Sequence, residues 1–193
     1  LTISTGLDAL SHALESLWNL NANPVSANHA VAAARSIIDV LPRLDGDLGD
    51  IELRSRMALA ALFAGLAFSN TKTAIAHNLS YPITLQHGVQ HGLACSFTLP
   101  MILRSVRGVG GQCESSLRQI FGYDLGRGAD ELEAFLGKLG VSCDPAAYGV
   151  DPADWRSLIA DALQGERGRN FLGSKDRLTE AARARSQPLA RTA

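Results

Sequence analysis

The sequence predicts an all-α protein, a bundle of about seven to nine helices. Of its 193 residues, 46% are hydrophobic but only 6% are aromatic, and this composition, rich in Ala and Leu, suits closely packed helices better than a sheet sandwich. Apolar residues recur at the spacing of amphipathic helices, and no segment alternates as a half-buried strand does. The length is enough for one domain with a substantial core, so we expect residues 1–193 to form a single domain.

The first part of the chain predicts three long helices. The first is expected over residues 5–20, with Thr5 as its N-cap and leucines along one stripe. A second begins near Pro24 and runs to about residue 41, and the Gly- and Asp-rich residues 44–50 predict a loop. The third, over residues 51–69, is apolar almost all round. That pattern predicts burial in the middle of the bundle.

The rest of the chain predicts shorter helices. Pro82 is expected to break the segment 77–91. The glycines of residues 108–111 predict a linker and not a phosphate-binding turn, because no strand precedes them. The remaining helices are expected at residues 92–106, 114–121, 129–139, 152–164 and 177–185, and residues 186–193 are expected to be a frayed tail.

Charge and cysteine content exclude several classes of function. A net charge of -1 gives no basic surface for nucleic acid. No apolar run reaches the roughly 18 residues of a membrane span, and no signal-peptide pattern opens the chain. The three cysteines are odd in number and widely spaced, which favours a reducing cytoplasm. The chain opens on Leu1 in a segment typical of the middle of a polypeptide, so we expect a domain or a truncated gene product.

Four residues indicate a metal site: Asp8, His12, His77 and His91. The spacing of Asp8 and His12 places both on one helix face, one turn apart. His77 and His91 lie on either side of Pro82 and can converge only through a turn. One carboxylate and three imidazoles suit a divalent transition metal such as Fe(II) or Zn(II), with one coordination position left for substrate.

Spacing alone leaves other interpretations open. A histidine is more often an ordinary hydrogen-bonded residue than a ligand, and Asp8 with His12 could be an acid near a helix N-terminus with an imidazole paired to it. His87 also lies four residues before His91, so spacing cannot say which of the two binds metal. His29 is interpreted as a helix-surface residue.

Four segments of the chain resemble the iron-containing (group III) alcohol dehydrogenase family. They are GLDALSHALE at residues 6–15, FSN at 68–70, HGLA at 91–94 and LP at 99–100. Their order and separation match the family up to about residue 125, and the remainder matches only in helical character. The resemblance implies an N-terminal nucleotide-binding α/β domain, outside this chain, followed by an all-helical domain of the dehydroquinate synthase-like type that supplies the metal ligands.

The resemblance also implies the ligand set. It places the metal ligands at Asp8, His12, His77 and His91, because the second of the family's two late histidines precedes Gly and leads to Leu-Pro, as His91 does. His87 lacks that context, so we assign it beside the ligands and not among them. A solvated histidine is its alternative interpretation.

Within the family, residues 17–24 and 79–84 look most like phosphonoacetaldehyde reductases. Some members carry a histidine where this chain has Tyr81, which could contact substrate or could equally be a buried structural tyrosine. A phosphonate dianion needs Arg or Lys to meet it. The candidates are Lys72, Arg167 and Arg169, each of which could also be an ordinary surface charge.

The activity implied by the resemblance is reversible hydride transfer between NAD or NADP and a primary alcohol or aldehyde. The chain has no Gly-rich turn for the dinucleotide, so we expect the absent domain to bind the cofactor and this polypeptide alone to have little activity. The expected partners are a small alcohol or aldehyde and, in the full-length enzyme, further copies of itself. Two alternatives are a non-catalytic metal-binding domain, which includes a remnant of such an enzyme, and a metal-free helical interaction module.

Overall fold

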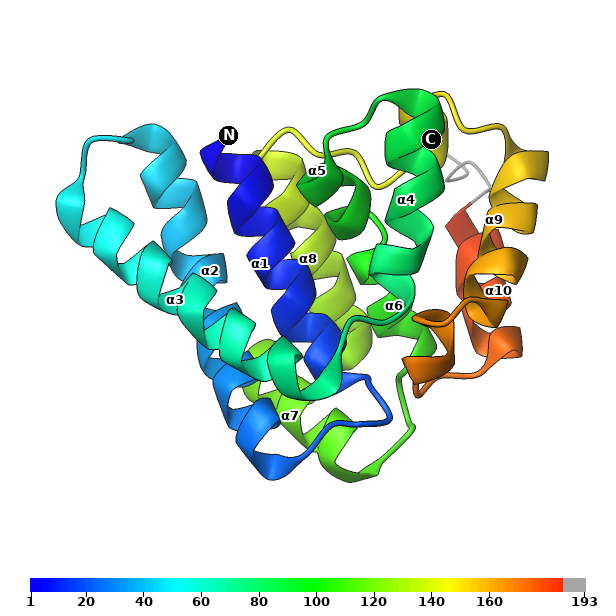
Figure 1. Cartoon of the computed structure of the whole chain (residues 1–193), viewed down its shortest axis with the longest axis horizontal. Helices are drawn as coiled ribbons and strands as arrows, with labels where there is room; N and C mark the ends of the chain where they lie inside the picture. Colours follow the sequence, from blue (N-terminus) through cyan, green and yellow to red (C-terminus); the bar gives the residue numbers. More distant parts are fainter. Residues whose placement is uncertain (186–193) are drawn as a thin grey trace, which may run out of the picture.

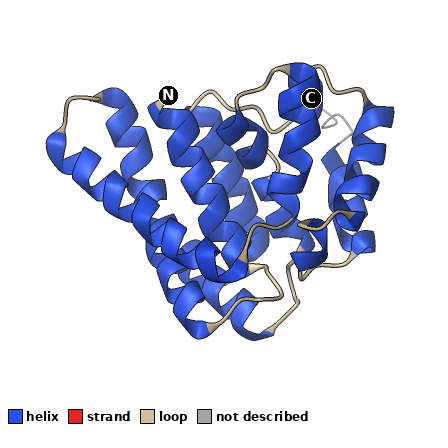
Figure 2. Ribbon diagram, in the orientation of Figure 1, coloured by secondary structure: helices blue, strands red, loops and turns tan. Residues whose placement is uncertain are grey.

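The computed structural model describes residues 1–185, and every regular element in that part of the chain is helical (Figure 1; Figure 2). The α-helices are α1 (Thr2–Leu17), α2 (Pro24–Gly46), α3 (Ile51–Thr71), α4 (Ile75–His87), α5 (His91–Ser96), α6 (Leu99–Ser105), α7 (Gly111–Phe121), α8 (Leu125–Lys138), α9 (Pro152–Gln164) and α10 (Lys175–Arg185). Two short 3₁₀ turns join them, η1 (Pro145–Tyr148) and η2 (Gly168–Asn170). The predicted all-α class is confirmed, with more and shorter helices among the described residues than the sequence led us to expect. The predicted tail, residues 186–193, lies outside the described residues.

Helix α1 lies in the centre of the molecule, with α2 and α3 on one side and α4 and α5 on the other (Figure 1). Its leucine stripe is buried, as predicted. Its bounds differ from the prediction, because the Thr5 hydroxyl donates back to the carbonyls of Leu1 and Thr2 and does not cap the helix. The helix ends before Asn19, which forms a bridge with Phe171 in place of another helical turn.

Helix α2 is longer than predicted and shortens the loop that follows. Asn23 caps its start by accepting from the backbone of Val25 and Ser26. The helix continues past Pro42 to Gly46, because Leu44 is buried in the core and anchors the last turn. Residues 47–50 remain as the connection.

The prediction that the third helix is buried all round is wrong. In α3 the leucines at 59, 62 and 66 are 51%, 57% and 42% exposed. The buried face consists of Leu53 and Met57 near the start of the helix and then of small residues, Ala60, Ala64 and Ala67. Because these alanines let α3 approach α1 and α2 closely, its bulkier leucines point away from the core. No helix among the described residues has the length and hydropathy needed to cross a bilayer.

Pro82 lies inside α4 and does not break it, contrary to the prediction. Proline removes one intrahelical hydrogen bond, and the buried Leu79 and Ile83 hold the turns on either side of it. The helix ends at Gly88, which has the left-handed conformation (φ 67°). The chain then turns back into α5, so the expected convergence of residues 77 and 91 through a turn is confirmed.

Two helices occupy the segment 92–106, where the sequence predicts one. Helix α5 ends at Ser96 and α6 begins at Leu99, with Pro100 in its first turn. Gly92, in the first turn of α5, lies directly against α1, because a Cβ at this position would collide with the Ser4 carbonyl oxygen. The glycine therefore lets the start of α5 approach the first turns of α1.

Helices α9 and α10 lie on the outer side of α4 and α6, whereas α7 packs against α2 (Figure 1). Asn78 of α4 donates to the carbonyl of Ala162 in α9 at 2.5 Å. Asn170 of η2 donates to the Thr73 carbonyl at 2.9 Å, and its own carbonyl accepts from the Leu20 backbone at 2.8 Å. These bonds fix η2 against the connection between α3 and α4. Residues 108–110 form a linker, as predicted, whereas Gly111 already begins α7.

Candidate metal centre

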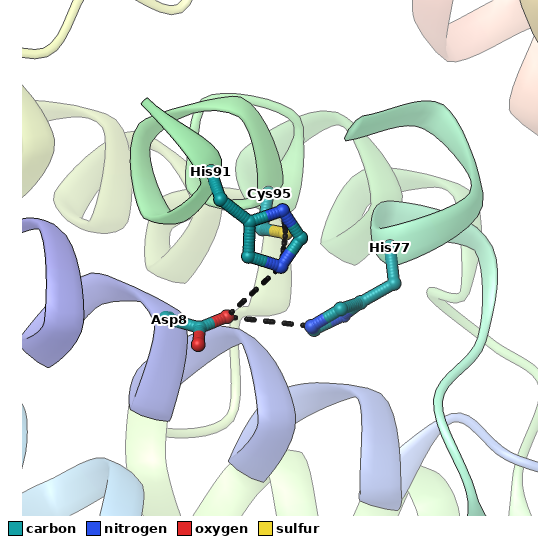
Figure 3. Close-up of side chains that lie close together, drawn as sticks. All are labelled: Asp8, His77, His91 and Cys95. Atoms are coloured by element: carbon teal, nitrogen blue, oxygen red, sulfur yellow. Dashed lines mark hydrogen bonds and ion pairs between the residues drawn. The ribbon is translucent and has the colours of Figure 1, made fainter. Parts of the chain in front are cut away.

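Three helices bring four ligand-type side chains together (Figure 3). Asp8 lies on α1, His77 in the first turn of α4, and His91 and Cys95 on α5. Their ligand atoms all lie within 4.8 Å of one another. Asp8 Oδ1 is 3.3 Å from His77 Nε2 and 3.7 Å from His91 Nε2. The structure therefore brings together three of the four predicted ligands, although His77 lies 69 positions after Asp8 in the sequence.

His12, the fourth predicted ligand, borders this group. Its Nε2 lies 3.6 Å from Asp8 Oδ2, which confirms that both residues share a face of α1. The His12 ring stacks on that of His77 with centroids 4.3 Å apart, and on that of Phe68 at 4.2 Å. The four side chains whose ligand atoms lie closest together include Cys95 and not His12.

Glu15 is the functional residue that the sequence reasoning missed. It is fully buried on α1 and accepts four hydrogen bonds from the start of α4. Three come from the backbone N–H groups of residues 74, 76 and 77, and the fourth joins Glu15 Oε2 to His77 Nδ1 at 2.6 Å. With Nδ1 donating to this carboxylate, Nε2 of His77 faces Asp8. Glu15 lies seven residues after Asp8, on the same face of α1, and that spacing could have revealed it.

The carboxylates and imidazoles shift one another's pKa values. Burial alone would raise the pKa of Asp8, but hydrogen bonds and charge from His12 and His77 lower it well below the usual range. Burial alone would lower the pKa of His77, but Asp8, Cys95 and Glu15 raise it. Burial lowers the pKa of His91, and the charges of His77, His12 and Arg167 add to that shift. The centre thus keeps a carboxylate charge and, without a metal, a proton on His77.

Two polar atoms at this centre indicate what it could hold. Asp8 Oδ1 and His77 Nε2 are buried and face each other at 3.3 Å, and neither atom forms a hydrogen bond of good geometry in the described part of the chain. Buried polar atoms in proteins are nearly always paired, so such an exception needs an explanation. A carboxylate oxygen and an imidazole nitrogen are both common ligands of divalent transition metals. The donor set, with these two atoms lacking a good hydrogen bond, fits a metal ion.

Comparisons with known proteins agree with this geometry. A family model, the C-terminal part of the Fe-containing alcohol dehydrogenase family, matches residues 2–176. The chain belongs to the iron-containing alcohol dehydrogenase family. Long-chain-alcohol dehydrogenase 1 of Geobacillus thermodenitrificans is 32% identical over 179 residues, which are 86% of this chain and 45% of that protein. Phosphonoacetaldehyde reductase of Streptomyces viridochromogenes is 30% identical over 175 residues, 83% of this chain and 43% of that protein.

A solved structure extends the likeness to the whole chain. Sulfoacetaldehyde reductase from Bifidobacterium kashiwanohense, in complex with NAD+, superposes with a TM-score of 0.83 and 28% sequence identity, covering 100% of this chain and 51% of that one. This chain therefore spans about half the length of the iron-containing dehydrogenases that it matches.

Cys95 is a second residue that the sequence reasoning missed. Its sulfur lies 3.6 Å from His91 Nε2, and the side chain is fully buried. Burial raises the pKa of this thiol, which keeps it protonated and makes it a poor ligand without a metal already present. The spacing of four residues after His91 on one helix is the signal that could have identified it.

The other predicted site residues are placed as follows. His87 ends α4 near Gly149, and no contact in the described structure joins it to Asp8, His77 or His91. Tyr81 stacks on His91 with centroids 5.9 Å apart. Arg167 and Lys72 line a cavity next to the centre, whereas Arg169 does not line it.

Proposed function

We propose that this chain is the metal-binding, catalytic half of an NAD- or NADP-dependent alcohol dehydrogenase or aldehyde reductase. Asp8, His12, His77 and His91 would hold one divalent ion, Fe(II) or Zn(II). The observation that carries this proposal is the convergence of Asp8, His77 and His91 from three helices, with buried ligand atoms on the first two that lack a good hydrogen bond. Membership of the iron-containing alcohol dehydrogenase family supports it.

Each residue of the proposed metal site has a separate role. A divalent ion in such a site supplies Lewis acidity toward the oxygen of an alcohol or aldehyde, and a nicotinamide supplies the hydride chemistry. Asp8 provides the single negative charge, and Glu15 holds His77 by its Nδ1–H. The ring of Phe68 stacks on that of His12. The His91 side chain is 40% exposed, so the centre is open to a substrate on the side of α5.

The fourth protein ligand distinguishes two versions of this site. We propose His12, because a neutral imidazole binds a metal without losing a proton, whereas the buried Cys95 must ionise first. A turn of its side chain would let the His12 Nε2, already 3.6 Å from Asp8, complete the set. Cys95 would then pack against His91 without contacting the ion.

Metal analysis of the purified chain tests this proposal. After reconstitution with Fe(II) or Zn(II), wild type, His87→Ala and Cys95→Ser are expected to hold about one ion per chain. His91→Ala and His12→Ala are expected to lose it, with thermal unfolding curves recorded for every variant to establish that each is folded. Metal lost in Cys95→Ser and kept in His12→Ala would replace His12 by Cys95. A wild-type chain that binds no ion would refute the proposal.

The activity requires the cofactor half of the enzyme. We propose that this polypeptide alone has little dehydrogenase activity, and that the full-length, homo-oligomeric enzyme reduces a small aldehyde, with phosphonoacetaldehyde as the specific candidate. A phosphonoacetaldehyde reductase among the relatives supports this choice. The test is NAD(P)H oxidation with phosphonoacetaldehyde before and after a nucleotide-binding half from a relative is supplied. Activity that never appears, with metal bound, would favour the non-catalytic metal-binding alternative.

A further inference from the structure

A cavity of about 290 Å³ borders the metal centre. Its lining residues are Phe68, Lys72, Thr73, Glu166, Arg167 and Asn170. They come from the end of α3, the connection to α4, and the segment at η2 that hydrogen bonds fix against that connection. The cavity is large enough for a small polar group and belongs to no ligand set described above.

The cavity contacts the metal centre along two routes. Phe68, which lines it, stacks on His12. The guanidinium of Arg167 lies 4.8 Å from the centroid of the Tyr81 ring, and that ring stacks on His91. The cavity lining therefore contacts His12 directly through Phe68 and reaches His91 through Tyr81.

We infer that this cavity binds the anionic end of a short aldehyde or alcohol, a phosphonate, sulfonate or carboxylate group, while the oxygen-bearing carbon faces the metal centre. The contact between the oxygen-bearing carbon and the metal centre rests on the proposed function. It assigns Arg167 and Lys72 to substrate specificity and leaves Arg169 out.

Charge supports an anion in preference to a neutral group. Lys72 and Arg167 bring two positive charges to the lining and Glu166 one negative charge. None of these three side chains forms an ion pair within residues 1–185. Arg167 uses only Nε, which donates to Thr73 Oγ1 at 2.9 Å, so its two terminal nitrogens form no hydrogen bond with the described residues. A guanidinium held in this way can offer two parallel donors to an oxyanion.

The backbone at Lys72 supports the same assignment. Lys72 has φ 67° and ψ 176°, and it is the one non-glycine residue with positive φ among residues 1–185. Almost only glycine adopts that region, and such strain is concentrated at binding and catalytic sites. Hydrogen bonds impose it: the Lys72 N–H donates to the Phe68 carbonyl at 2.7 Å, and the Lys72 carbonyl accepts from Asn19 Nδ2 at 3.2 Å. A lysine at a position suited to glycine indicates a role for the side chain.

Binding of methylphosphonate to the metal-free chain isolates this cavity from the metal. We expect saturable binding by calorimetry that weakens as ionic strength rises. Arg167→Gln and Lys72→Met should each weaken it about tenfold, the size of one lost charge-assisted hydrogen bond. Glu166→Gln should tighten it, because the opposing charge is gone. Arg169→Gln is the matched control and should bind as wild type does.

Two more probes separate the sources of an anion. 2-Hydroxyethylphosphonate carries an alcohol as well as the phosphonate, so loading the chain with Zn(II) should tighten it more than methylphosphonate. ADP represents the phosphates of a dinucleotide and should not compete with methylphosphonate. Competition by ADP that Arg167→Gln abolishes would assign the cavity to the cofactor and overturn the inference.

The remaining outcomes distinguish this inference from the proposed function. No saturable methylphosphonate binding, or equal weakening by Arg169→Gln and Arg167→Gln, would overturn the inference. Zn(II) content, measured in the same samples, is expected to be unchanged by all four substitutions. If Zn(II) binds and methylphosphonate does not, the metal centre stands without this subsite. If methylphosphonate binds with the expected variant pattern and Zn(II) does not, the anion site stands without the proposed metal chemistry.

Discussion

Glu15 Oε2 and His77 Nδ1 lie 2.6 Å apart, although 62 positions separate the two residues in the sequence. This contact joins the last turn of α1 to the first turn of α4. The same carboxylate accepts three backbone N–H groups that the start of a helix leaves without intrahelical partners. One buried side chain therefore both caps α4 and orients the His77 imidazole toward Asp8.

Replacing Glu15 should damage stability and metal binding together. Glu15→Ala leaves four donors buried and unpaired, and we expect a loss of about 3–5 kcal/mol in the free energy of unfolding. Glu15→Gln preserves the shape and should cost less, but its amide cannot accept all four donors. In that variant the affinity for Zn(II) should fall about 10–100-fold, as for other partners of metal-bound histidines. Urea unfolding measures the stability, and competition with a chelating dye measures the affinity for Zn(II). Substitution of an exposed glutamate, Glu52→Gln, is the control. An unchanged affinity in Glu15→Gln would contradict an orienting role.

The pH dependence of stability should differ between the metal-free and metal-loaded chain. The raised pKa of His77 gives stability that is complete below the unfolded value of 6.5 and is lost as pH rises. The lowered pKa of Asp8 gives stability that is present above the unfolded value of 3.8 and is lost as pH falls. The metal-free chain should therefore be most stable between these two values. His91 acts in the opposite direction to His77, but its half-exposed ring makes that effect small.

Metal binding should reverse the loss of stability at higher pH. A bound ion needs an unprotonated Nε2 on His77, so binding releases a proton and strengthens as pH rises. The increase in Tm on adding Zn(II) should be larger at pH 8 than at pH 6, because the raised pKa of His77 keeps it protonated in the metal-free chain at both values and fewer protons compete with the ion at pH 8. An equal increase at both values would show that His77 carries no displaceable proton.

Lys72→Gly should stabilise the chain. Glycine relieves a backbone strain of about 1–3 kcal/mol at φ 67°, and its greater freedom in the unfolded state returns about 0.5–1 kcal/mol of that gain. We expect a net increase of about 1 kcal/mol in the free energy of unfolding, measured in urea. Lys72→Ala keeps a Cβ and the strain with it, so it should show no such gain. Equal stabilities of the Gly and Ala variants would mean that the backbone at this position is relaxed.

Gly92→Ala should separate α5 from α1. The new methyl group would collide with the Ser4 carbonyl, and relieving the collision moves His91 away from Asp8. We expect a cost of about 1–3 kcal/mol, as for other overpacked contacts, together with loss of bound Zn(II). Gly65→Ala is the matched control, because a Cβ there meets nothing within 4 Å, and it should stabilise α3 by about 0.5–1 kcal/mol. Retention of the ion in Gly92→Ala would show that α5 can shift without displacing His91.

The sequence predicted the helical class and the grouping of Asp8, His77 and His91. Local periodicity predicts helices, and a family resemblance identifies ligands, and neither requires knowledge of how the helices pack. The sequence did not predict which face of α3 is buried, since an all-apolar helix carries no periodicity and the choice depended on how closely Ala60 and Ala64 approach α1. The prediction that Pro82 breaks its segment was wrong, because a helix anchored by buried neighbours tolerates the loss of one hydrogen bond. Glu15 was missed because a charged residue is expected at the surface, and only the structure shows the four donors around it. The role of His12 as a metal ligand stays a prediction, which metal analysis tests.

The positions of Asp8, His77 and His91 also bear on how the molecule comes apart. An ion held by these side chains would tie α1 to α4 and α5 and so close the intervening α2 and α3 into a ring. Such a cross-link removes conformations from the unfolded chain in proportion to the logarithm of the loop length, as a disulfide does. Helices α7 to α10 lie outside the ring and contribute no side chain to the centre. Amide exchange in the metal-loaded chain should therefore slow most within residues 8–91, leaving the later helices free to open on their own.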